Sequence, residues 1–195
     1  MTADEALKRL KDGNERFLRD ETHFATPRKD ALAALQKGQS PFATVLGCSD
    51  SRVPVEIIFD AGFGDLFIVR VAGNVLSPEV MASLQFAGAI LETSLFVVLG
   101  HEGCGAVKAA LDWQLYGRSQ RSRIQILVDS IAPGLPPVDY KMSEEERVAL
   151  AVEANVRWTM HQIMETPEAK VRSGEGKMKL VGAVFEIATG RVRFL

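Results

Sequence analysis

Short apolar runs that do not alternate with polar residues limit the fold of this 195-residue chain more than any other feature. Runs of this kind are typical of strands that are covered on both faces of a parallel sheet. Each run is followed by a segment with the spacing of a helix, so the strands and helices alternate along the chain. The three clearest runs are 42–47, 66–71 and 95–100.

Start signals in the sequence place helices between and after these strands. Ser77 is a typical N-cap, with Pro78 in the first turn and Glu79 near the positive end of the helix dipole. Later in the chain we expect helices at 105–115 and 121–131, a long helix after Ser143, a strand at 179–186 and a short antiparallel strand at 191–195. This order predicts an α/β fold with a central, mostly parallel sheet of four strands flanked by helices and an antiparallel addition at one edge.

Residues 1–38 are expected to form an N-terminal helical arm, with helices at 3–20 and near 29–38. The apolar residues of the first helix make only a narrow stripe, which can pack on a partner subunit or on the chain's own domain. No linker or internal repeat interrupts the rest of the chain. Its length fits one domain that covers residues 1–195.

Charge and composition exclude several classes of partner. The net charge is −2, from 23 basic and 25 acidic residues, and no run of Lys or Arg suggests binding to nucleic acid or an anionic membrane. No apolar stretch approaches the ~20 residues of a membrane-spanning helix. Charges interrupt the first ten residues, unlike a signal peptide, so we expect a cytoplasmic protein.

Two cysteines and a histidine lie at the ends of predicted strands. Cys48 follows the first strand, His101 ends the third, and Cys104 comes three residues later. Functional side chains gather at the carboxyl ends of strands in open parallel sheets. Two thiolates and an imidazole suit Zn²⁺, and three protein ligands with an open fourth position are typical of catalytic zinc. Taken one at a time, each cysteine could instead be buried and inert.

Asp50 and Arg52 add a possible charged pair beside these ligands. Asp50 can reach the same ion as Cys48, while Arg52 can hold Asp50 through a bidentate contact. Two other site types fit the sequence poorly. A nucleophile elbow would need glycine at Glu102, and a phosphate-binding loop would need lysine at Ala106.

Two complete motifs stand at these strand ends: Cys48-Ser49-Asp50-Ser51-Arg52 and His101-Glu102-Gly103-Cys104-Gly105. Together they resemble the β-class carbonic anhydrases, and further matches at 38–41, 67–74 and 182–183 extend the resemblance over most of the chain. The resemblance implies that Cys48, His101 and Cys104 are zinc ligands and that Asp50 and Arg52 form a dyad beside the metal. It also implies substrate contacts by Gln39, nine residues before Cys48, and by the backbone amide of Gly105.

The activity that this family implies is the reversible hydration of CO₂ to bicarbonate and a proton by zinc-bound hydroxide. Asp50 can either ligate the zinc or be held away by Arg52. A homodimer or homotetramer is implied, with the N-terminal helices wrapped on the partner. One alternative on the same scaffold is hydrolysis of carbonyl sulfide or carbon disulfide. A non-catalytic zinc protein is a second, but it would have no need of Asp50, Arg52 and Gln39.

Overall fold

A five-stranded sheet forms the centre of the computed structural model, which describes residues 1–23, 32–33, 35–137 and 139–195. The strand order is β2-β1-β3-β4-β5; every neighbouring pair is parallel except β4 and β5, which are antiparallel. The predicted fold class is therefore confirmed. The strands are β1 Ala43–Gly47, β2 Leu66–Arg70, β3 Leu95–His101, β4 Lys179–Phe185 and β5 Val192–Phe194.

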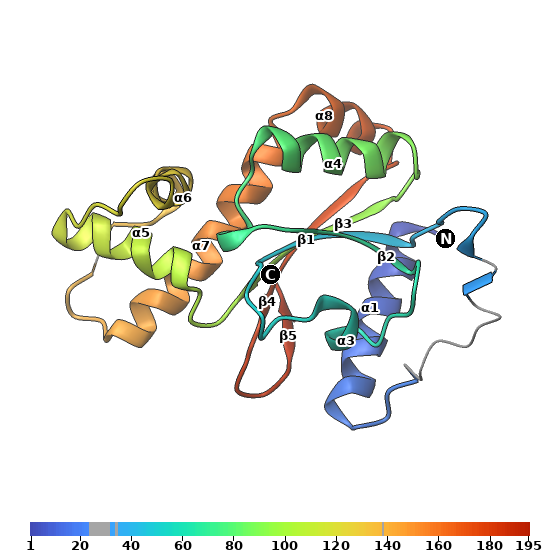
Figure 1. The fold of residues 1–195 in the computed structure, drawn as a ribbon, viewed down its shortest axis with the longest axis horizontal. Helices are drawn as coiled ribbons and strands as arrows, with labels where there is room; N and C mark the ends of the chain where they lie inside the picture. The colour runs from blue at the N-terminus through green and yellow to red at the C-terminus, as the bar shows by residue number, and fades with distance from the viewer. Residues whose placement is uncertain (24–31, 34, 138) are drawn as a thin grey trace.

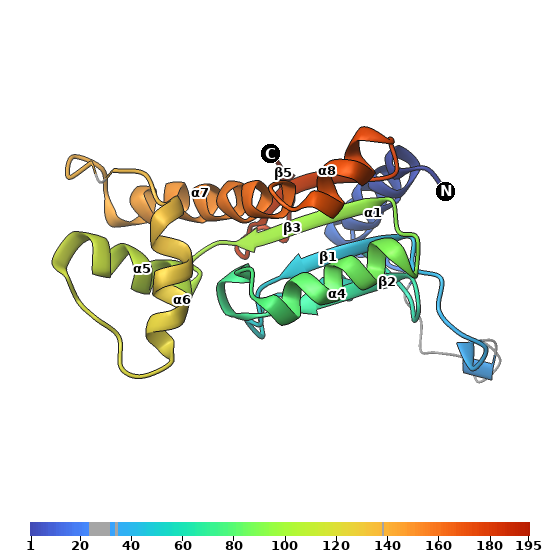
Figure 2. The ribbon, with the colours of Figure 1, turned by 90° about the horizontal axis from the view of Figure 1, so that it is seen from above.

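Helices cover both faces of the sheet (Figure 1). Helices α1 and α3 lie on one face, and α4, α7 and α8 lie on the other. Figure 2 shows that α5, α6 and the first part of α7 extend beyond the carboxyl ends of the parallel strands. The helices are α1 Ala3–Leu18, α3 Val55–Ile58, α4 Pro78–Ala89, α5 Gly105–Tyr116, α6 Ile124–Ile131, α7 Glu144–Met164 and α8 Pro167–Gly174, with short 3₁₀ turns η1 Ala72–Asn74 and η2 Ala132–Gly134.

The start signals of the helices work as their residue types predict. The Ser77 hydroxyl accepts a hydrogen bond from the N–H of Val80, and Pro78 occupies the first turn of α4. Ser143 and Glu146 form a capping box at the start of α7. The short helices α3 and α8 were not expected from the sequence.

The strands differ in how well they are covered. Every residue of β1 and β3 is buried, as the unbroken apolar runs predict. The prediction that 66–71 is buried on both faces is wrong for this chain, because β2 is an edge strand whose residues are only partly covered. An edge strand pairs with one neighbour only, which leaves its other side open.

The N-terminal helix α1 packs on its own sheet. Ala6 and Leu10 have no exposed surface and belong to the same apolar cluster as residues of β1 and β3. The Asn14 amide donates to the carbonyls of Ile58 and Gly190, and this further ties α1 to α3 and to the β4–β5 turn. Of the two alternatives for the apolar stripe, the structure shows packing within the chain. The second predicted helix, near 29–38, lies largely outside the described residues.

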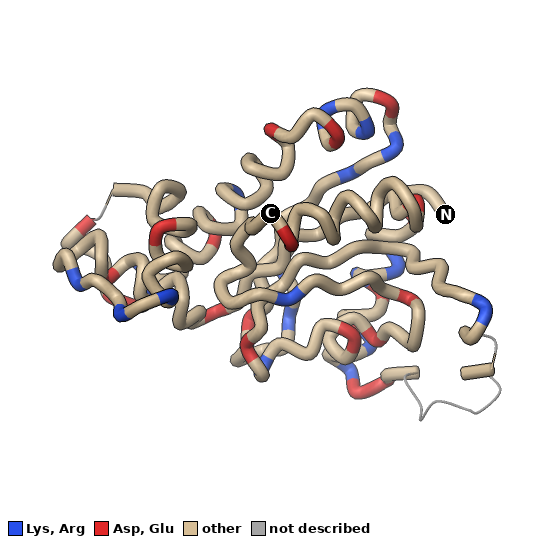
Figure 3. Tube along the Cα trace, turned by 45° about the horizontal axis from the view of Figure 1, so that its top comes forward, with Lys and Arg blue, Asp and Glu red and all other residues tan. Residues whose placement is uncertain are grey.

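Charge is spread evenly over the described part of the chain. Figure 3 shows basic and acidic positions interspersed along the trace, consistent with the small net charge. Among the described helices, none combines the length and the apolar character that crossing a membrane requires.

Candidate metal centre

Cys48, His101 and Cys104 meet at the carboxyl end of the sheet. Cys48 follows β1, His101 is the last residue of β3, and Cys104 is the N-cap of α5. Strands β1 and β3 are paired in parallel up to Gly47 and Leu99, so they end at the same edge. The ligand atoms of the three residues all lie within 4.8 Å of one another, and all three side chains are buried.

The histidine is oriented as a metal ligand would be. Its Nδ1 lies 2.9 Å from the carbonyl oxygen of Glu102, which can only accept, so the Nδ1 nitrogen carries the proton. The Nε2 nitrogen is then left with its lone pair. It is buried and has no hydrogen-bond partner among the described residues. Such an orphaned acceptor beside two sulfur atoms fits Zn²⁺, which takes sulfur and nitrogen ligands.

The two thiols shift each other's pKa in opposite directions. The neighbouring Cys104 thiol, with a smaller contribution from the N–H of Gly73, lowers the pKa of Cys48 against the opposing effect of burial. The same pairing with Cys48, together with burial, raises the pKa of Cys104. A metal cation would bind both sulfur atoms as thiolates, so it suits two buried thiols that lie this close together.

Asp50 is held by Arg52 beside the cluster. Two guanidinium nitrogens of Arg52 donate to the two carboxylate oxygens at 2.9 and 2.7 Å, and the backbone N–H of Arg52 adds a third contact at 2.9 Å. These contacts hold the pKa of Asp50 well below its usual range, so the group is a carboxylate. Its nearer oxygen lies 3.8 Å from Nε2 of His101. Asp50 therefore stands next to the three ligands while Arg52 occupies its oxygens.

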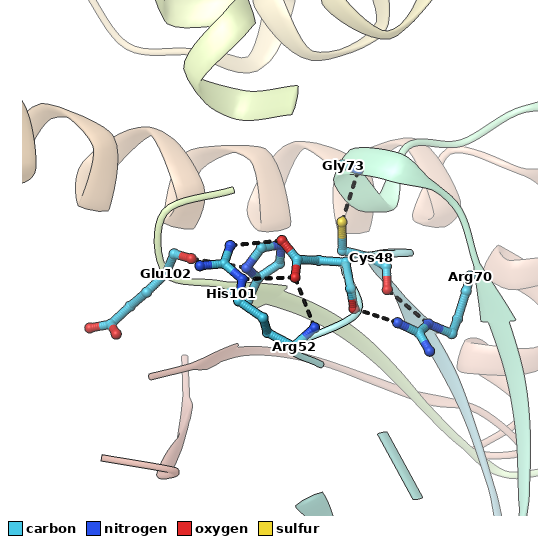
Figure 4. A network of polar contacts seen from close by, with 7 residues as sticks. Cys48, Arg52, Arg70, Gly73, His101 and Glu102 are labelled. Carbon is cyan, nitrogen blue, oxygen red and sulfur yellow. Dashed lines mark hydrogen bonds and ion pairs between the residues drawn. The ribbon is translucent and has the colours of Figure 1, made fainter. Parts of the chain in front are cut away.

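Two further residues contact the segment that carries Cys48, and sequence reasoning missed both. The guanidinium of Arg70, the last residue of β2, donates to the backbone carbonyls of Cys48 and Asp50. The N–H of Gly73 donates to the Cys48 sulfur at 3.3 Å. Both contacts appear in Figure 4. Besides the family resemblance at 67–74, the sequence offered one signal, an arginine that interrupts an otherwise apolar run.

Helix α7 holds the turn that contains Gly73. The buried Asn155 amide donates to the Gly73 carbonyl at 2.9 Å, and the buried Thr159 hydroxyl donates to the Asn74 carbonyl at 3.2 Å. Gly73 has a φ of 71°, which favours glycine, and a Cβ there would lie 2.8 Å from Ile131. A buried asparagine within the apolar stripe of a helix is the sequence signal for such a contact.

The structure places the two predicted substrate contacts differently. Gly105 is the first residue of α5, next to Cys104, and its N–H belongs to the first turn, where a helix leaves its donors unpaired. Gln39 is exposed and precedes β1, whereas Cys48 follows β1. At about 3.3 Å per residue, the strand between them puts roughly 15 Å between the two positions. Within one chain, Gln39 is therefore not part of the cluster.

Comparisons with known proteins agree with this geometry. A family model described as carbonic anhydrase matches residues 43–192. Carbonic anhydrase 2 of Mycobacterium tuberculosis is 37% identical over 95% of this chain and 89% of its own length. The solved structure of the β-carbonic anhydrase CcaA has a TM-score of 0.77 and 26% identity, and covers 96% of this chain and 94% of that one.

A second structural neighbour comes from the fungus Sordaria macrospora, in a study of two tetrameric β-carbonic anhydrases. Its TM-score is 0.74 at 25% identity, with 98% of this chain and 95% of that one covered. The matches include both motifs at the carboxyl end of the sheet, because the family model spans 43–192. The chain therefore belongs to the β-carbonic anhydrase family.

Proposed function

We propose that this chain catalyses the reversible hydration of CO₂ to bicarbonate and a proton, with Zn²⁺ held by Cys48, His101 and Cys104. One observation carries the proposal: two buried sulfur atoms converge at the end of the sheet with the Nε2 of His101, which has no hydrogen-bond partner in the described part of the chain. Membership of the β-carbonic anhydrase family supports it. We further propose that residues 1–195 are one domain, and that the enzyme is cytoplasmic, a compartment in which the free thiols of Cys48 and Cys104 stay reduced.

The residues around the cluster can each perform a part of this reaction. When bound, Zn²⁺ supplies a water of lowered pKa and hence a hydroxide nucleophile at neutral pH. The Asp50 carboxylate accepts a hydrogen bond from the nucleophile and so orients its lone pair toward CO₂. Arg52 keeps that carboxylate ionised and away from the ligands. The N–H of Gly105 donates to an oxygen of the developing bicarbonate.

Gln39 can take part only from another chain. The resemblance implies a substrate contact for Gln39. In its own chain, however, Gln39 lies at the opposite end of β1 from the cluster. We therefore propose that the working unit is at least a homodimer in which Gln39 of one copy reaches the site of the other. A homotetramer built from such dimers is compatible with this arrangement.

The primary test is a stopped-flow assay of CO₂ hydration, repeated with carbonyl sulfide as substrate. We expect a higher kcat/KM for CO₂, because the relatives that match over most of the chain are named carbonic anhydrases. A higher kcat/KM for carbonyl sulfide would support the alternative hydrolase. Zinc binding without either activity would support the non-catalytic alternative.

The shared site is tested by mixing two inactive variants. Gln39→Ala keeps the ligands but lacks the glutamine, and Cys104→Ala lacks a ligand but keeps the glutamine. After subunit exchange, each hybrid dimer contains one intact combination, so activity should return. If mass spectrometry shows hybrids and the mixture stays inactive, Gln39 does not act across the interface.

A further inference from the structure

Arg70 makes an unusual pair of contacts with the segment that carries Cys48 and Asp50. It is the last residue of β2 and lies opposite Gly47 in the sheet register, one residue before Cys48. Its Nε donates to the Cys48 carbonyl at 2.9 Å, and its Nη2 donates to the Asp50 carbonyl at 2.6 Å. One planar guanidinium thus bridges two backbone carbonyls of the segment that follows the neighbouring strand β1, as Figure 4 shows.

The two carbonyls belong to Cys48, a proposed metal ligand, and to Asp50, the carboxylate that Arg52 binds. The Asp50 carbonyl also accepts the N–H of Val53, which closes the turn. With both carbonyls held, the backbone from Cys48 to Asp50 has little freedom to rotate. The direction of the Cys48 sulfur toward the cluster and of the Asp50 carboxylate toward Arg52 is fixed by that same backbone.

The charge of Arg70 is directed at these carbonyls. The side chain is exposed, and no carboxylate of the described residues forms an ion pair with it. Hydrogen bonds from a charged donor are roughly twice as strong as neutral ones, and the fixed fork of arginine matches two acceptors at once. We therefore expect Arg70 to hold the Cys48–Asp50 turn and not to serve as one half of a surface ion pair.

We propose that Arg70 is a positioning residue that holds the Cys48–Asp50 turn, so that the sulfur faces the metal position and the carboxylate stays with Arg52. The proposal rests on the proposed zinc-dependent function and adds Arg70 to Arg52 as a second arginine on which that function depends. Arg70 touches neither substrate nor metal in this scheme. It acts through the backbone of two residues that do.

The test compares Arg70→Met and Arg70→Lys with the wild type, and uses Arg193→Met as the matched control. Arg193 is an exposed arginine of β5 that pairs with Glu153, and strand β4 lies between it and β3. For each zinc-loaded protein, we would measure zinc release to a chromogenic chelator, kcat and KM for CO₂, and the melting temperature. Partners that orient metal ligands typically affect metal affinity or activity by 10–100-fold.

We expect Arg70→Met to release zinc about ten-fold faster or more and to lose kcat by a similar factor, with KM within about two-fold. Its melting temperature should change no more than that of Arg193→Met, because the freed carbonyls lie where water can reach them. Arg70→Lys should fall between wild type and Arg70→Met, since one ammonium group cannot span two carbonyls as a planar fork does.

Two outcomes would overturn the proposal. One is an Arg70→Met variant that releases zinc and turns over like the wild type. The other, decisive if Arg70→Met fails to fold, is an Arg70→Lys variant that matches the wild type in both readouts, since positive charge alone would then suffice. Wild-type protein that binds zinc but does not hydrate CO₂ would refute the proposed function, while the zinc-release ratios would still test the role of Arg70.

Discussion

Asp50 is one carboxylate with two competing positions. Its nearer oxygen is 3.8 Å from the His101 nitrogen, so a small movement would bring it among the ligands. Arg52 binds both oxygens, and a carboxylate cannot satisfy a bidentate guanidinium and a metal ion fully at the same time. With Arg52 binding both oxygens, a zinc ion held by the three ligands would keep its fourth position for the nucleophile.

Removal of Arg52 should therefore inactivate the enzyme without removing its metal. In Arg52→Ala, Asp50 is free to take the fourth position, so we expect full zinc content and a kcat lower by about 10²-fold. Zinc analysis beside stopped-flow kcat at neutral pH measures both. Near wild-type turnover would show that the pair is only a structural salt bridge.

Removal of Asp50 should also leave the zinc content unchanged and lower kcat, but for a different reason. Asp50→Ala keeps the three ligands and so keeps zinc, but the nucleophile loses the group that orients it. We expect kcat to fall by about 10²-fold or more. Loss of zinc in this variant would instead identify Asp50 as a metal ligand at rest.

The two cysteines should be needed for metal content itself. Wild-type protein should contain about one zinc per chain, and Cys48→Ala or Cys104→Ala should lose most of it, because two ligands bind Zn²⁺ far more weakly than three. Ser49→Ala, at an exposed neighbouring position, is the control and should keep its zinc. Elemental analysis decides; full retention in both cysteine variants contradicts the ligand assignment.

The sequence predicts the candidate metal ligands of this site better than the residues that hold those ligands in place. Cys48, His101 and Cys104 stand at strand ends, where a local motif and the rule for parallel sheets are enough to bring them together. Gly73 and Asn155 lie far apart in the sequence, and their connection through one carbonyl exists only once α7 has packed on the sheet. No periodicity or spacing predicts such a contact.

Among the elements, long and strongly patterned ones follow from the sequence and short ones do not. The β1 and β3 runs are apolar because both sides are covered, and α7 shows its buried side through Val148, Val152 and Val156. Helix α3 has only four residues, too few to show a period. The position of β2 at the edge is also invisible in its composition, since strand order depends on the whole chain.

Helix α1 illustrates an ambiguity that only packing resolves. A narrow apolar stripe can face a partner or the chain's own sheet, and here Leu10 has no exposed surface and lies against β1 and β3. Helix α1 is therefore part of the core on one face of the sheet, beneath the strands that carry the Cys48–His101–Cys104 cluster. Any contact with a second copy would use the other side of α1.

Truncation of Leu10 should consequently destabilise each chain. Leu10→Ala should cost about 2–5 kcal/mol of unfolding free energy, equal to about 2–4 °C in melting temperature per kcal/mol for a chain of this size. Glu15→Ala, exposed on the same helix, is the control and should change stability by less than about 0.5 kcal/mol. A loss that disappears at high protein concentration would instead place Leu10 at a subunit interface.

At the scale of the whole molecule, the exposed side of β2 is the clearest incomplete surface. A half-covered edge strand with apolar residues is usually protected by another chain or element. Gln39 also lies at the opposite end of β1 from the cluster of its own chain. Both features favour an oligomer of this chain. Light scattering at micromolar concentration should give at least the mass of two chains; a mass of 21.3 kDa would contradict the proposed dimer.

The packing of α7 on the sheet has a consequence for how this chain can diverge in evolution. A Cβ on Gly100 would lie 2.6 Å from Val156, and a Cβ on Gly182 would lie 2.9 Å from the same valine. One valine therefore lies over glycines of two neighbouring strands, and a side chain at either glycine would force Val156 or its helix to shift. Among relatives that keep the two cysteines and the histidine, the positions of Gly100, Val156 and Gly182 should vary together or stay fixed.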